Sequence, residues 1–148
     1  MFEFKRAIHF DFHTVEKIDN ILSQFDAVDF AQTLQNANVS YINFTAMCNN
    51  GFCYYPTKVG ITYPNLKRDI LGEVIKECHK KDIGVTAYLN VGINFMAAKN
   101  HIEWSRISEK GNVLDTFNNF VHDCDHKEGN FFTRSMCFNK PGYNNYIL

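Results

Sequence analysis

The sequence has little excess of charge of either sign and no long apolar run. Its 148 residues include 15 Lys and Arg against 16 Asp and Glu, which gives a net charge of −1, and the basic residues are scattered along the chain. Nucleic acid or an anionic membrane surface as the main partner would require a basic patch. A membrane-spanning helix would need about 20 consecutive apolar residues, and a signal peptide would need an apolar core near the N-terminus. The sequence therefore predicts neither a nucleic-acid nor a membrane partner.

Paired cysteines and phosphate-binding glycine motifs are also missing. The five cysteines are an odd number, and none has CxxC spacing. This usage is typical of reduced thiols, so we expect a cytoplasmic protein. No GxGxxG motif follows the first predicted strand, which argues against a dinucleotide site. We therefore expect no cofactor and no structural metal.

Hydrophobic periodicity predicts three strands separated by helices. The hydrophobic content of 45% and the charged content of 21% indicate one globular domain with a real core. Residues 7–13, AIHFDFH, alternate strictly between apolar and polar side chains and predict a strand. A helix is expected from Asp26, where Asp29 three residues later resembles a capping box. Further elements are expected as a strand at 41–46, a helix at about 67–81 and a strand at 85–90.

This β-α-β-α-β order has short turns before the strands and long loops after them, which is typical of an α/β barrel with its site on the C-terminal face. A doubly wound open sheet fits the same order. After a helical segment at 97–107 and an irregular stretch at 108–132, another helix begins at Pro141 and reaches Leu148. We therefore expect residues 1–148 to be a truncated, N-terminal portion of a single parallel (β/α)8 TIM barrel, about its first three βα units.

Alternation along the strands places one set of polar side chains inside such a barrel, toward its C-terminal rim. The set comprises Asp11, His13, Thr45, Met47, Asn49, Thr86, Tyr88 and Asn90. Converging polar groups are costly to bury unless they are paired or face a ligand. Two interpretations stay open: the residues hydrogen-bond one another and nothing else, or they bind a ligand.

Three stretches carry a resemblance to α-L-fucosidases. The segment TAMCNNGFCYYPTK at 45–58 resembles the second-strand motif of that family, Thr-Ala-Lys-His-His-Asp-Gly-Phe followed by aromatic residues. The segment RDILGEVIKECHKKDIGVTAYLNVG at 68–92 resembles the helix and third strand, and FDFHT at 10–14 the first strand. NHIEW and CFNKPGYNNYIL are more similar to a branch of uncharacterised glycosidases related to the fucosidases. The likeness covers nearly the whole chain, but the family's Lys-His-His-Asp is replaced by Met47-Cys48-Asn49-Asn50.

The resemblance implies a glycoside hydrolase that retains anomeric configuration and acts on a carbohydrate substrate. Such a mechanism needs two carboxyl groups about 5 Å apart, and the resemblance places both beyond Leu148, so we expect no catalytic residue in this chain. The alternatives are a non-catalytic carbohydrate-binding barrel and an inactive fragment. Asp11 is interpreted as structural.

The expected sugar contacts come from two kinds of argument. His13, Asn49 and Asn50 match family positions, and Asn can still donate and accept hydrogen bonds to hydroxyl groups. Tyr54, Tyr88 and Asn90 are added because they lie at a strand end or in the loop rich in amides and rings. A partial barrel would leave strand edges open, so a homo-oligomer is a further expectation.

Weaker signals favour structural roles. HDCDHKE at 122–128 has residue types that bind metals, but the surrounding glycine and asparagines favour a polar loop. Cys48 with His13 is an alternative nucleophile pair that no spacing supports. Trp104 is interpreted as fixing its own helix.

Overall fold

The computed structural model describes residues 6–14, 18–109, 111, 113 and 135–148. In chain order its elements are β1 (Ala7–Phe10), α1 (Ala27–Asn36), β2 (Tyr41–Met47), β3 (Phe52–Cys53), β4 (Ile61–Thr62), α2 (Ile70–His79), β5 (Gly84–Leu89), α3 (Phe95–Asn100), the 3-10 helix η1 (Ile102–Trp104) and α4 (Pro141–Ile147). None of the helices in these ranges is long and apolar enough to cross a membrane.

The sheet is mixed, with a parallel part built from the three predicted strands. β2 lies between β1 and β5 and runs parallel to both, so that His9, Asn43 and Thr86 are aligned across the three strands. β3 runs antiparallel to β2, and β4 pairs with β3 in parallel. The parallel arrangement predicted for β1, β2 and β5 is confirmed, whereas β3 and β4 were expected to be loop.

The first strand is shorter than predicted. β1 ends at Phe10 rather than at residue 13. Beyond Phe44, one edge of β2 pairs with the β3 hairpin instead of with β1: Tyr54 N donates to Ala46 O at 2.9 Å. The other edge continues toward β5, where Asn90 N donates to Met47 O at 3.1 Å. The hairpin that follows β2 therefore takes the place that a longer β1 would occupy.

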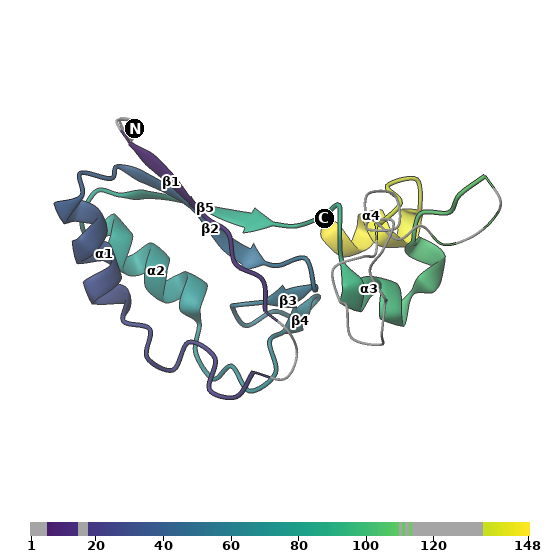
Figure 1. Cartoon of the computed structure of the whole chain (residues 1–148), viewed down its shortest axis with the longest axis horizontal. Helices are drawn as coiled ribbons and strands as arrows, with labels where there is room; N and C mark the ends of the chain where they lie inside the picture. Colours follow the sequence, from purple (N-terminus) through teal and green to yellow (C-terminus); the bar gives the residue numbers. More distant parts are fainter. Residues whose placement is uncertain (1–5, 15–17, 110, 112, 114–134) are drawn as a thin grey trace, which may run out of the picture.

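Both long helices begin at capping aspartates and cover one face of the sheet (Figure 1). Asp26 accepts hydrogen bonds from Val28 N at 2.8 Å and Asp29 N at 3.1 Å, which satisfies two of the free N–H groups at the start of α1. Asp69 caps α2 by accepting from Gly72 N at 2.8 Å. That cap explains why α2 begins at Ile70, three residues later than predicted.

The main core lies between this helical layer and the sheet. Ile42 and Phe44 on β2 are 0% and 3% exposed, and Phe10 packs beside them with its ring 5.0 Å from that of Phe30 on α1. Ile8 and Phe12 pack against the same cluster. The apolar face predicted from strand alternation is therefore the face that packs under the helices.

A second, smaller core forms beyond the strand ends, where α3, η1 and α4 pack together (Figure 1). The Tyr143 hydroxyl on α4 donates to Val91 O at 2.7 Å, and burial raises the pKa of this phenol to about 12. Trp104 stacks on His101 with ring centroids 3.8 Å apart and packs against Tyr146 at 5.7 Å. These contacts support a structural role for Trp104.

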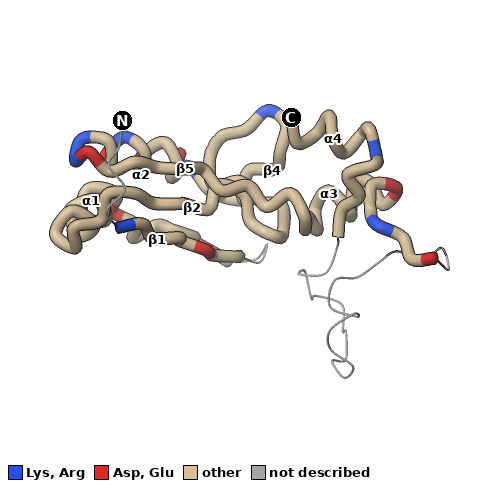
Figure 2. The backbone as a smooth tube through the Cα atoms, turned by 90° about the horizontal axis from the view of Figure 1, so that it is seen from above, with Lys and Arg blue, Asp and Glu red and all other residues tan. Residues whose placement is uncertain are grey.

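Figure 2 shows charged positions of both signs at both ends of the molecule.

Candidate functional site

Polar side chains from three strand ends meet at the C-terminal edge of the parallel strands. The backbone N–H of Asn49, after β2, donates to His13 Nδ1, after β1, at 3.3 Å. The Asn90 side-chain amide, after β5, donates to Asn49 Oδ1. Asn90 Oδ1 in turn accepts from Ile93 N at 3.1 Å. We call His13, Asn49 and Asn90 the polar row. Three of the six predicted contact residues are thus joined in one hydrogen-bonded chain, and their contact with a sugar stays a prediction.

A carboxylate extends the polar row on the β1 side. His13 Nε2 lies 3.1 Å from Asp11 Oδ1. Because Nδ1 accepts a backbone N–H, the proton of the neutral ring is on Nε2, the nitrogen that faces Asp11. The His13 side chain is 22% exposed, whereas the Asp11 side chain is 48% exposed. Sequence reasoning did not predict this pair, although the i, i+2 spacing on a strand would have allowed it.

Two other predicted contact residues, Asn50 and Tyr54, are fully buried. The Asn50 amide donates to Thr14 O at 2.5 Å, and the Tyr54 hydroxyl shares a hydrogen bond with Thr14 Oγ1 at 2.5 Å. Burial raises the pKa of the Tyr54 phenol far above its ordinary value. Both side chains tie the segment after β1 to the loop after β2 and so fix the position of Asn49. Their own contact with a sugar stays a prediction, as it does for every residue of the set.

Tyr88 lies on the face of the sheet opposite α1 and α2. Its ring packs edge-on against that of His9, with centroids 5.3 Å apart. On the same face, the Tyr41 hydroxyl and Thr86 Oγ1 share a hydrogen bond. Tyr88 is only partly buried, two residues before Asn90. This face therefore presents a ring and several polar groups close to the polar row.

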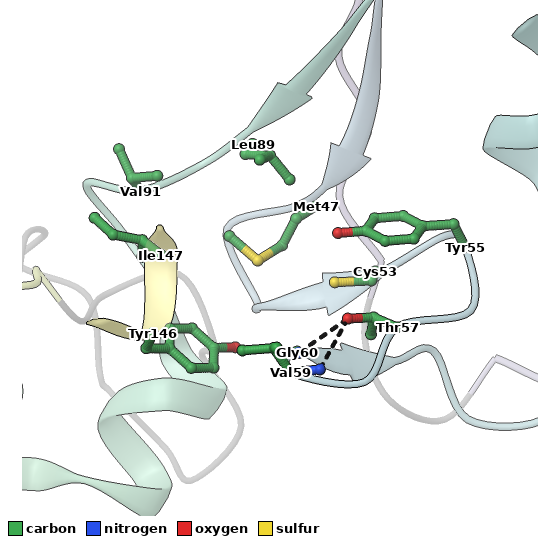
Figure 3. Close-up of a pocket in the computed structure, with 10 residues that line it drawn as sticks. All are labelled: Met47, Cys53, Tyr55, Thr57, Val59, Gly60, Leu89, Val91, Tyr146 and Ile147. Carbon is green, nitrogen blue, oxygen red and sulfur yellow. Dashed lines mark hydrogen bonds between the residues drawn. The ribbon is translucent and has the colours of Figure 1, made fainter. Parts of the chain in front are cut away.

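An apolar cavity of ≈ 80 Å³ lies between the end of β2 and helix α4 (Figure 3). It is lined by Met47, Cys53, Tyr55, Thr57, Val59, Gly60, Leu89, Val91, Tyr146 and Ile147. Burial raises the pKa of the Cys53 thiol, so this group is neutral near pH 7. Sequence reasoning placed Met47 inward, but no local signal joins it to residues of α4, which lie far along the chain.

Cysteine and metal chemistry find little support in the described part of the chain. Its four cysteines, Cys48, Cys53, Cys78 and Cys137, have free thiols, and Cys48 is buried in the main core. No three His, Cys, Asp or Glu side chains there come together as a metal site. The HDCDHKE segment at 122–128 lies outside the described residues.

One protein family matches most of the chain. The model of this family, described as hypothetical glycosyl hydrolase 6, matches residues 26–147. The chain belongs to this family. None of the curated proteins matches it.

The solved structures that resemble this chain include α-L-fucosidases. The α-L-fucosidase isoenzyme 2 from Paenibacillus thiaminolyticus is 30% identical over 96% of this chain and 20% of its own, with a TM-score of 0.80. An α-L-fucosidase from Bacteroides thetaiotaomicron is 35% identical over 46% of this chain and 16% of its own, with a TM-score of 0.44. The Thermotoga maritima α-fucosidase is 21% identical over 49% of this chain and 18% of its own, with a TM-score of 0.44. The chain thus spans about a fifth of the Paenibacillus enzyme. The predicted fucosidase resemblance is confirmed.

Proposed function

We propose that this chain forms the first three βα units of a fucosidase-like (β/α)8 barrel and that a sugar binds at its polar row. The observation that carries the proposal is the hydrogen-bonded chain from His13 through Asn49 to Asn90, at the C-terminal ends of three parallel strands. Barrel enzymes build their sites at this end of the strands. The similarity to the Paenibacillus fucosidase over 96% of the chain supports the same arrangement.

The proposed contacts follow from the chemistry of each side chain. A sugar hydroxyl both donates and accepts hydrogen bonds, as an amide does, so Asn49 and Asn90 can exchange their mutual bond for bonds to hydroxyls. Tyr88 offers the flank of a ring to an apolar face of the sugar. Asn50 and Tyr54 contribute by holding the loop on which Asn49 lies.

The proposed reaction of the whole protein is hydrolysis of a glycosidic bond with retention of configuration. It requires two carboxyl groups about 5 Å apart. In the part of the chain that the structure describes, Asp11 is the one carboxylate beside the polar row. Following the fucosidase resemblance, we propose that other residues of the whole protein supply the nucleophile and the acid. A non-catalytic carbohydrate-binding barrel is the second candidate, because a single carboxylate at these strand ends suffices for binding.

Sugar binding and turnover by this chain test the proposal separately. We expect L-fucose or a related monosaccharide to bind, as seen by ligand-observed NMR, and 4-nitrophenyl α-L-fucoside to remain uncleaved. Asn49→Ala and Asn90→Ala should each weaken binding by about 0.5–1.5 kcal/mol. Unchanged affinity with a lowered melting temperature would mean that the polar row only supports the scaffold. Turnover by the chain alone would refute the placement of the carboxylates.

We also propose that the chain self-associates and is cytoplasmic. β1 and β5 each pair on one edge only among the described strands, and Leu89 at the end of β5 is 42% exposed. Such edges favour pairing with another chain. Sedimentation velocity should show a dimer or larger species whose fraction rises with concentration. A monomer at all concentrations would exclude self-association. The free thiols of the described cysteines support the cytoplasmic location.

A further inference from the structure

Both ring nitrogens of His13 already have partners within the protein. Nδ1 accepts the Asn49 backbone N–H at 3.3 Å, and Nε2 lies 3.1 Å from Asp11 Oδ1. The imidazole is therefore occupied on both sides in its neutral form. The more exposed member of the pair is Asp11, at 48% against 22% for His13. A direct sugar contact by His13 would instead require an available ring nitrogen and a histidine more exposed than Asp11.

We propose that Asp11 contacts the substrate and that His13 is a positioning residue that acts through Asp11. The inference rests on the proposed sugar-binding function and names a further group of that site. Asp11 has two carboxylate oxygens with about four acceptor sites, so it can accept a sugar hydroxyl while Oδ1 stays in contact with His13 Nε2. A hydrogen bond to a charged carboxylate is roughly twice as strong as one between neutral groups. The ligand class is a sugar that offers hydroxyls to both a carboxylate and the neighbouring amides.

The surroundings of Asp11 fit this role. The contact between Asp11 and His13 places both side chains on the same side of the chain. His9, two residues before Asp11, packs edge-on against Tyr88 at 5.3 Å. His9 alternates with Ile8 and Phe10, which pack against the main core, so it lies on the face away from α1 and α2. His13 is in turn fixed by the backbone of Asn49. Contacts through His13 and Asn49 thus connect the carboxylate of Asp11 to the amide of Asn90 at these strand ends, and the Tyr88 ring lies two residues before Asn90.

Four variants separate the two roles. Asp11→Asn keeps an oxygen that accepts from His13 but removes the charge and one acceptor. His13→Gln keeps a donor for Asp11 and an acceptor for Asn49 N–H, whereas His13→Ala keeps neither. Asp82→Asn makes the same change of charge at an exposed turn before β5, at the opposite end of the sheet. Affinity for L-fucose is measured by NMR titration of the whole chain, and side-chain ¹⁵N shifts report which His13 nitrogen is protonated.

We expect His13 to be protonated at Nε2 in the wild type and in Asp11→Asn. Asp11→Asn should nevertheless bind L-fucose about tenfold more weakly or worse. His13→Ala should also weaken binding, His13→Gln should restore most of the affinity that His13→Ala loses, and Asp82→Asn should bind as the wild type does.

Three results would overturn the inference, and they differ from one another. If Asp11→Asn binds as tightly as the wild type, Asp11 makes no contact with the sugar. If His13→Gln is as weak as His13→Ala, the imidazole itself contacts the sugar. If the wild type binds neither L-fucose nor related monosaccharides, the proposed function fails, and this inference fails with it.

Discussion

Replacing Gly51 by alanine tests whether the loop after β2 supports helix α3. Gly51 has φ +85°, and its N–H donates to Cys48 O at 2.8 Å in the turn that leads into β3. A Cβ atom at this position would lie 2.1 Å from Asn94 Oδ1 and 3.2 Å from Met96 Cβ. Asn94 is fully buried and caps α3 by accepting from Ala97 N at 2.9 Å. The substitution therefore affects both the backbone conformation of the loop and the helix cap.

The magnitude follows from these two effects. A left-handed conformation costs a residue with a Cβ about 1–2 kcal/mol. Moving the buried Asn94 amide weakens a cap worth about 0.5–2 kcal/mol and forces overpacking that costs about 1–3 kcal/mol. The backbone and overpacking costs alone sum to about 2–5 kcal/mol, so we expect Gly51→Ala to lower the free energy of unfolding by at least this amount, a large part of the total stability of a typical domain.

Gly111→Ala is the matched control. Gly111 has φ +81°, but among the described residues beyond its chain neighbours no atom lies within 4 Å of the position that a Cβ would take, so the backbone cost dominates. Urea unfolding followed by circular dichroism gives the stabilities, and the emission of Trp104 reports on the packing around α3. If Gly51→Ala is no less stable than Gly111→Ala, the described contact between the loop and α3 is wrong.

Three further predictions concern a helix cap, a buried thiol and the packing of Trp104. Asp26→Ala should lower the free energy of unfolding by about 1 kcal/mol through loss of the α1 cap, measured by urea titration; Asp19→Ala, at an exposed turn outside any cap, should change it less. Burial raises the pKa of Cys78 from 9.0 to about 11. Between these values the unfolded chain loses the thiol proton while the folded chain keeps it, so stability relative to Cys78→Ala should fall by up to about 2–3 kcal/mol as pH rises; a constant difference across that range would contradict this. Gly142→Ala would place Cβ 2.6 Å from Trp104 Nε1 and should shift the emission of this single tryptophan; an unchanged spectrum would refute that contact.

Local features of the sequence predicted much of the main sheet and its helices. The cap at Asp26 and the apolar stripe through Ala31 and Leu34 are contained within one segment, so α1 could be placed from the sequence. Alternation likewise placed Ile42 and Phe44 on the face under the helices. Both signals depend on residues a few positions apart, so they could be read without knowledge of contacts between distant parts of the chain.

Features that depend on distant partners could not be predicted in the same way. The sequence placed Tyr54 in the loop after β2 without indicating its partners. In the structure Tyr54 is buried, its hydroxyl shares a hydrogen bond with Thr14 Oγ1, and its ring packs on Phe12, 4.8 Å away. The short strand β3 exists because Gly51 turns the chain back onto β2. At the candidate site, alternation predicted that the strand ends converge, but the order of partners from Asp11 to Asn90 depends on side-chain contacts between separate strands.

The pairing of β2 has a consequence for how this sheet can grow. β1 and then β3 occupy one edge of β2, while β5 occupies the other as far as Leu89. The amide hydrogens of β2 should therefore exchange with solvent more slowly than those of β1. A strand supplied from elsewhere can add to the described sheet at its outer strands, β1, β4 and β5. Enlargement of the sheet at any of these edges leaves in place the strand that leads to Asn49.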